Sequence, residues 1–177
     1  YTKTQIMISE NVRKFAENVV LPVATAIDRD DVFPKEVYAQ LAELGLFGAT
    51  LNEEAGGSGF DTVSLAIAME ELARCSGSVG NILAIPVEAV HLLYNSGNDR
   101  HKEFIPGILS GELIPATCVS EPEFGSDVAS IKTTAVRDNG EYIINGTKAW
   151  VSLGLVANLF FVFAKTDPES GQRGLSC

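Results

Sequence analysis

The feature that most constrains the fold is a change of residue pattern near Ile114. Before it, apolar residues recur at steps of three and four, the spacing of one face of a helix. After it, short segments are rich in β-branched and aromatic residues, which favour strands. The sequence therefore predicts an α+β chain, with an all-α domain over residues 1–112 and a mostly antiparallel β-domain over residues 113–177. The first helical stripe is formed by Ile8, Val12, Phe15 and Val19.

Prolines, a glycine and an aspartate mark the expected helix ends. Pro22 is expected to bound the first helix, and Pro34 suits the first turn of the second, which Gly45 closes as its C-terminal cap. Asp61 stands where an N-cap begins the next helix. Pro86 is expected to kink the following apolar helix. The last two helices are predicted over residues 79–94 and 99–109.

Turn signals separate the segments of the β-domain. Asp138-Asn139-Gly140 between two strand-like runs is a strong hairpin signal, and Asn145-Gly146 marks a second turn. The predicted strands are Ile114–Ser120, Thr133–Arg137, Glu141–Ile144 and Leu159–Thr166.

Composition excludes several classes of protein. Hydrophobic residues make up 46% of the chain and charged residues 20%, which is typical of a globular protein rather than a disordered one. The formal charge of −10 argues against nucleic acid or an anionic membrane surface as a partner, because both require clustered positive charge. The longest apolar run, Leu155–Ala164, is interrupted by Asn158 and is shorter than the ~20 residues that span a membrane.

Cysteine and histidine usage narrows the chemistry. Cys75, Cys118 and Cys177 are odd in number and far apart, which fits a reducing compartment better than a disulfide framework. His91 and His101 have no cysteine at ligand spacing, so no metal site is predicted. The closing residues resemble the start of a strand, so we expect the chain to be part of a longer protein.

Three segments have residues suited to ligand binding. The glycine-rich run 56–59 lacks the Lys-Ser/Thr end of a P-loop and follows no strand, which favours a structural connector over a phosphate site. Residues 118–127 turn at Pro122 and present hydroxyls, a glycine and backbone amides. They suit the edge of a planar heterocycle or a phosphate, or equally a loop whose Ser and Asp cap its own backbone.

The third segment, residues 145–152, holds the only Trp of the chain. In a strand, Trp150 and Ser152 point to the same side, and together they suit one wall of a ring-cofactor site. The alternative is a Trp half-buried in a β-core.

Taken together, these segments resemble the acyl-CoA dehydrogenase family. The family signature requires a small residue, an aliphatic residue, Ser or Thr, and Glu, and then a small residue, Gly, Ser or Thr, and Asp at fixed spacing, with a final small residue three positions later. Phe124 departs from the pattern, because a small residue is usual there, and Leu153 stands where Asn is common. Further similar segments are residues 56–59, 70–73, 142–150 and 173–176. The residues that fit the signature are Cys118, Val119, Ser120, Glu121, Gly125, Ser126, Asp127 and Ser130.

The resemblance implies an antiparallel β-barrel-like second domain and an FAD enzyme that dehydrogenates an acyl-CoA thioester between Cα and Cβ. It implies that Ser126 also contacts the CoA substrate and that the Ser152 hydroxyl lies near flavin N5. The family's catalytic Glu lies in a C-terminal helical domain absent from this chain, so no catalytic residue is expected here and Glu121 is expected to be structural. The implied cofactor-binding residues are Thr117, Val119, Ser120, Gly125, Ser126, Trp150, Val151 and Ser152.

The resemblance further implies a homotetramer that passes electrons to electron-transfer flavoprotein. A bacterial cytoplasmic location is expected, with the mitochondrial matrix as the alternative. Two rival hypotheses keep the fold: a flavin oxidase or monooxygenase, and a non-catalytic scaffold that has lost flavin.

Overall fold

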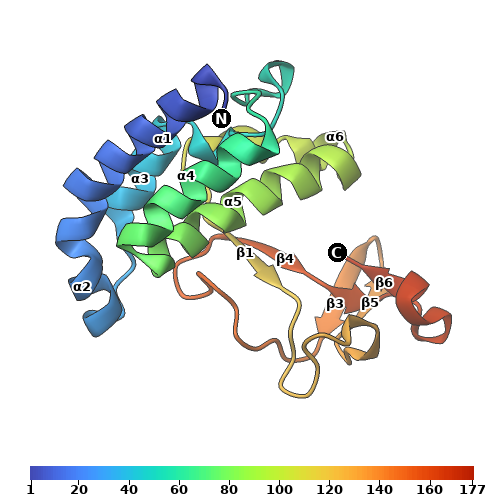
Figure 1. Cartoon of the computed structure of the whole chain (residues 1–177). Coiled ribbons are helices and arrows are strands. Elements are labelled where there is room, and N and C mark those ends of the chain that lie inside the picture. Colours follow the sequence, from blue (N-terminus) through green and yellow to red (C-terminus); the bar gives the residue numbers. More distant parts are fainter. The chain divides into compact units, whose positions relative to one another are not determined.

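The computed structural model describes residues 1–177 as two compact units, Tyr1–Ile114 and Pro115–Cys177 (Figure 1). The first unit is helical and the second contains all the strands, so the predicted α+β class is confirmed. The division between the units falls two residues after the boundary expected from the sequence.

Seven α-helices and three short helical turns build the first unit. Helices α1 and α4 pack against each other, and α4 packs against α5 (Figure 1). The elements are α1 (Lys3–Phe15), η1 (Ala16–Val20), α2 (Leu21–Asp30), α3 (Lys35–Glu43), η2 (Leu46–Gly48), η3 (Glu53–Ala55), α4 (Thr62–Cys75), α5 (Gly77–Ser96), α6 (Asp99–Lys102) and α7 (Ile105–Leu109).

The first helical stretch does not end at Pro22, so that expectation is wrong. The chain passes through one π-helical turn, η1, in which the Leu21 N–H donates to the Ala16 carbonyl, and continues as α2. Pro22 occupies the first turn of α2, where its missing N–H removes no bond of that helix. The helical path ends at Asp31, whose φ of 50° is left-handed.

Other helix ends follow the sequence signals. Gly45 after α3 has a φ of 71°, the left-handed conformation of a C-terminal cap. The Asp61 carboxylate accepts a 2.7 Å hydrogen bond from the Ser64 N–H and caps α4. Tyr38 and Phe47 are fully buried, with ring centroids 4.7 Å apart, in the core of this unit.

A charged network joins α1 to α4. The Glu71 carboxylate, 6% exposed, accepts hydrogen bonds from the Ser9 hydroxyl at 3.0 Å and from the Arg13 guanidinium at 2.6 and 3.0 Å. Arg74 adds a longer contact to the same carboxylate and pairs with Glu17. These donors outweigh burial and lower the pKa of Glu71 to about 2, so the carboxylate is charged wherever this unit is folded near neutral pH.

Helix α5 is the long apolar helix of the unit. It is one continuous helix that contains Pro86, and the kink expected there stays a prediction. It is long and apolar enough to cross a membrane by length and composition. More than half of this stretch is buried inside the unit, where residues such as Leu83 and Val90 are fully enclosed. The burial accounts for its apolar character as a core helix.

The glycine-rich run is a packed connector, as the sequence favoured. The N–H groups of Gly57, Ser58 and Gly59 donate to backbone carbonyls of residues 48–52. A Cβ at Gly57 would lie 2.1 Å from the Leu51 carbonyl oxygen, so only glycine allows this approach.

Six strands form two sheets in the second unit. In one, β1 and β4 pair in parallel; in the other, the order is β3-β2-β5-β6. The pairings β2–β3 and β5–β6 are antiparallel, whereas β2–β5 is parallel. The strands are β1 (Pro115–Cys118), β2 (Thr134–Asp138), β3 (Glu141–Asn145), β4 (Leu159–Val162), β5 (Ala164–Lys165) and β6 (Leu175–Ser176).

The predicted hairpin joins β2 to β3. Asn139 and Gly140 both have positive φ, 48° and 90°, as a two-residue hairpin turn requires. Strand β3 is an edge strand, and Tyr142, Ile143 and Ile144 are all more than half exposed, so apolar side chains lie on both of its faces.

Candidate cofactor site

The signature loop begins where β1 ends. Thr117 lies in β1 opposite Phe161 of β4 and is half-buried, as are Val119 and Ser120 just beyond the strand. The chain then turns tightly, because the Glu121 N–H donates to the Phe124 carbonyl at 2.8 Å and the Phe124 N–H donates back at 3.2 Å. The turn fixes the path of the chain directly after the strand.

The second half of the loop is open. Gly125 and Ser126 are both exposed, and a Cβ at Gly125 would meet no atom within 4 Å. The Ser130 hydroxyl donates to the Asp127 carboxylate at 2.5 Å, which is a bond between side chains, and Asp127 does not cap the backbone of the turn that follows it. Ser126 is exposed and is available to a ligand.

The Trp150 segment is not a strand, so the expected alternation of Trp150 and Ser152 along a strand is wrong. Trp150 has a left-handed φ of 59°, and Ser152 begins a turn. The indole is 89% exposed, which also excludes the half-buried Trp of the alternative hypothesis. Val151 is half-buried and Ser152 is exposed. A large aromatic ring held in a disfavoured backbone conformation and left uncovered is typical of a binding surface.

Leu153 gives a backbone reason for one departure from the family pattern. Its φ is 62°, a region that Asn tolerates better than a bulky side chain. Its carbonyl accepts the N–H groups of Val156 and Ala157, both at 2.9 Å, so the surrounding turn holds this conformation. The Asn that is common at position 153 in the family therefore suits this backbone conformation, independently of any contact made by its side chain.

The structure brings the two predicted cofactor segments together. The Ala149 N–H donates to the Ser120 carbonyl at 2.9 Å, and the Lys148 ammonium donates to the Val119 carbonyl at 2.9 Å. Residues 119–121 therefore lie beside residues 148 and 149, although about thirty positions separate them along the chain.

Glu121 lies under both segments and is almost fully enclosed. One carboxylate oxygen accepts from the Thr133 N–H at 2.9 Å, the Thr133 hydroxyl at 2.6 Å and the Lys148 ammonium at 3.0 Å. The other accepts from the Lys132 N–H at 2.6 Å. Burial alone would raise the pKa of Glu121, but these hydrogen bonds outweigh it and lower the pKa to about 2. These contacts agree with the structural role expected for Glu121.

Sequence reasoning missed Lys148 and Thr133 as partners of Glu121. The side chains of Lys148 and Glu121 are only 10% and 5% exposed and form a buried ion pair. The sequence held only a weak signal for this pair: Lys148 and Glu121 are charged residues within segments already selected as candidate binding sites. Nothing in the local pattern of either segment indicates that they meet.

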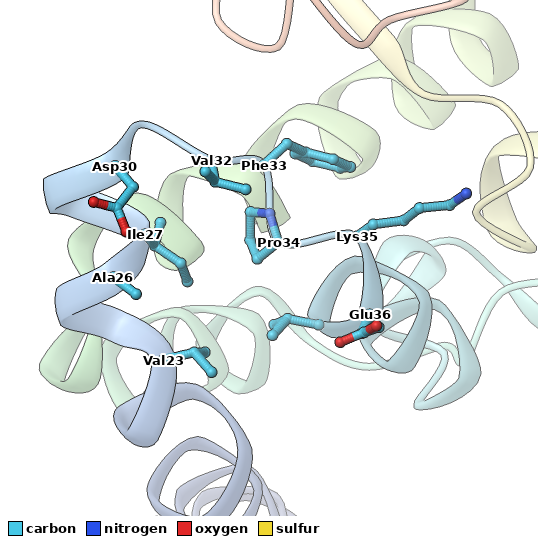
Figure 2. A pocket seen from close by; sticks show the side chains of 10 residues that line it. Val23, Ala26, Ile27, Asp30, Val32, Phe33, Pro34, Lys35 and Glu36 are labelled. Atoms are coloured by element: carbon cyan, nitrogen blue, oxygen red, sulfur yellow. The ribbon is translucent and has the colours of Figure 1, made fainter.

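Two hollows were found in addition to these loops. One, of about 300 Å³, is lined by the turn residues 121–124 together with Lys132, Gly146 and Thr147. The other, of about 430 Å³, lies between α2 and α3 in the helical unit and is mostly apolar, with Asp30, Lys35 and Glu36 among its lining residues (Figure 2). No group of three His, Cys, Asp or Glu side chains is placed to hold a metal ion.

These features define a class of protein: an α+β chain whose sheet unit holds two adjoining loops with exposed hydroxyls and an uncovered indole. Two family models match it in succession. The acyl-CoA dehydrogenase N-terminal domain matches residues 2–112, and the acyl-CoA dehydrogenase middle domain matches residues 116–177. The chain belongs to the acyl-CoA dehydrogenase family.

Individual relatives agree with this assignment. An acyl-CoA dehydrogenase of Bacillus subtilis is 35% identical over 177 residues, which cover 99% of this chain and 47% of that protein. A structure described as the electron transferring flavoprotein of Acidaminococcus fermentans matches with 31% identity and a TM-score of 0.93, covering 99% of this chain and 47% of the other. A glutaryl-CoA dehydrogenase from Mycobacterium smegmatis in complex with FADH2 matches with 28% identity and a TM-score of 0.90, covering 94% and 44%. The chain therefore spans about half the length of these relatives.

The residues present fit a flavin ring. A flavin has an apolar face and an edge of alternating donors and acceptors, and the loops offer an uncovered indole together with hydroxyls at Ser126 and Ser152. The two nearby cations are both paired: Lys148 is buried with Glu121, and Lys132 pairs with Glu123 at the surface. Trp150, Ser126 and Ser152 are exposed in these loops.

Proposed function

We propose that the whole protein is an FAD-dependent acyl-CoA dehydrogenase that forms a double bond between Cα and Cβ of an acyl-CoA thioester. The observation that carries this proposal is the match of both family domains, in order, across nearly the entire chain. The adjoining loops of the second unit support it, because they supply a surface suited to a planar heterocycle.

The proposal assigns binding, rather than proton transfer, to this chain. Thr117, Val119 and Ser120 line the strand end, and Gly125 and Ser126 extend from it. Trp150, Val151 and Ser152 form the adjoining loop. Ser126 also contacts the CoA substrate in this proposal. Flavin, when bound, supplies an acceptor for the hydride that leaves Cβ.

The enclosed carboxylate of the site, Glu121, is poorly suited to take the α-proton. Glu121 is the only acidic side chain enclosed beneath the loops, and its four hydrogen bonds hold its pKa near 2. A base with so low a pKa is too weak to remove a proton at neutral pH. In agreement with what the family resemblance implies, the proposal places the catalytic base outside these 177 residues.

Electron-transfer flavoprotein is the proposed electron acceptor, supported by the structure whose description names that protein. A homotetramer is the proposed assembly. Both proposals concern the whole protein, because this chain spans only about half the length of its relatives.

The visible spectrum of the full-length gene product, followed by anaerobic titration with acyl-CoAs of different lengths, tests the proposal. A yellow protein that bleaches with one thioester establishes the dehydrogenase half-reaction and its substrate class. A colourless protein that FAD cannot reconstitute would refute it and favour the scaffold hypothesis. Rapid reoxidation of the reduced protein in air would instead favour the oxidase or monooxygenase hypothesis.

A further inference from the structure

A buried ion pair fastens the two candidate cofactor loops to each other. The Lys148 ammonium donates both to the Val119 carbonyl at 2.9 Å and to the Glu121 carboxylate at 3.0 Å. Glu121 in turn is held by the backbone N–H groups of Lys132 and Thr133. The Lys148 side chain therefore links the Trp150 segment to the end of β1 and to the turn after it. We call Glu121 and Lys148 the loop clamp.

Burying the two charges of the loop clamp costs free energy. Removing an ammonium and a carboxylate from water costs several kcal/mol for each ion, and the attraction between them offsets this only with good geometry and further hydrogen bonds. A surface ion pair is already present nearby, between Lys132 and Glu123, whose side chains are 68% and 66% exposed. A buried pair with defined partners restricts position far more than an exposed pair does.

The place of the clamp indicates what it positions. Lys148 precedes Trp150 by two residues, and the Ala149 N–H between them binds the Ser120 carbonyl. Its other contact is the carbonyl of Val119, itself a candidate cofactor residue. We propose that the loop clamp is a positioning device that sets the distance between the Ser120 and Trp150 loops before flavin binds, and that Lys148 is a positioning residue for the cofactor. This inference rests on the proposed function.

Replacing both charged residues of the loop clamp with neutral ones distinguishes an effect on loop position from an effect on folding. Lys148→Met alone leaves the Glu121 carboxylate buried without its cation, and it is expected to destabilise the protein. The double variant Glu121→Gln/Lys148→Met removes both charges. The amide oxygen can still accept from the Thr133 N–H and hydroxyl, whereas the amide NH2 replaces the oxygen that accepts from the Lys132 N–H, so that one hydrogen bond is lost. The control is Lys132→Met, which breaks the exposed ion pair and leaves the backbone N–H in place.

Two quantities are measured on each full-length protein: the melting temperature of the apoprotein and the dissociation constant for FAD. If the clamp positions the loops, the double variant recovers a melting temperature within a few degrees of wild type but binds FAD at least tenfold more weakly. Lys148→Arg, which keeps the charge and the donors, binds FAD more tightly than the double variant. The control matches wild type in both quantities.

A double variant that recovers both stability and FAD affinity would overturn the inference and leave the clamp a purely structural pair. Failure of the wild-type protein to bind FAD would instead overturn the proposed function. Hydrogen exchange in wild-type apoprotein needs no variant: the Ala149 N–H is expected to be protected before FAD is added. An Ala149 amide that exchanges freely until FAD binds would show that the cofactor, rather than the clamp, orders the loops.

Discussion

Replacing Trp150 by alanine is expected to weaken flavin binding without weakening the fold. The side chain is 89% exposed, so its removal deletes few contacts within the chain. A Trp buries about 150–250 Å² when fully covered, and a ring stacked on one indole face covers about 80–100 Å² of it. At about 25 cal/mol per Å², this contact contributes about 2–2.5 kcal/mol, so Trp150→Ala is expected to raise the FAD dissociation constant about 30- to 60-fold.

The assay is calorimetric titration of full-length apoprotein with FAD, together with the melting temperature. Leu155→Ala is the matched control, because Leu155 is completely exposed in the turn that follows Trp150 and is not a candidate cofactor residue. We expect Trp150→Ala to keep the wild-type melting temperature of the apoprotein, and the control to change neither quantity. Unchanged affinity in Trp150→Ala, or an equal loss in the control, would refute the argument that the indole covers the ring.

Three further changes test the fold and the loops. Glu71→Gln is expected to cost about 1–2 kcal/mol at pH 7, allowing for the half-exposed Arg13. The lowered pKa of Glu71 makes its contribution full above about pH 4.5 and lost as the pH falls through about 2. Urea unfolding of variant and wild type should therefore converge near pH 2, and a constant difference would contradict this. Gly57→Ala, whose Cβ meets the Leu51 carbonyl, is expected to lower the unfolding free energy by about 3 kcal/mol or more; a wild-type melting temperature would exclude the clash. Leu153→Asn is expected to stabilise the protein by about 0.5–1 kcal/mol by relieving its left-handed φ, and a lower melting temperature would show that packing of the leucine prevails.

The parts of the fold that sequence predicted are those determined over a few residues. The Asp61 cap depends on an N–H three residues away, and the hairpin depends on the positive φ of Asn139 and Gly140. Pro22 shows the limit of such rules: the sequence marks the missing donor, but a π-helical turn before it lets the helical path continue. Whether the chain bends or adapts there depends on packing, which a local pattern does not contain.

The candidate site was predicted in composition but not in geometry. Ser120 and Trp150 were selected from the sequence, and the structure brings their loops together. The predicted strand conformation of Trp150 was wrong, because the alternation of residues along a sequence does not reveal a left-handed φ. The clamp between Glu121 and Lys148 was missed, because their meeting depends on strands paired across long stretches of chain, including the parallel β1–β4 and β2–β5 pairings.

Strand β3 has a practical consequence for work with this chain. It is the outer strand of its sheet, with a free edge, and Tyr142, Ile143 and Ile144 expose apolar surface on both faces. An open edge of this kind can recruit the same strand from another copy, which is the geometry of fibril growth. A preparation of these 177 residues alone is therefore expected to need low protein concentration, and its colloidal state should be checked by light scattering before any binding measurement is interpreted.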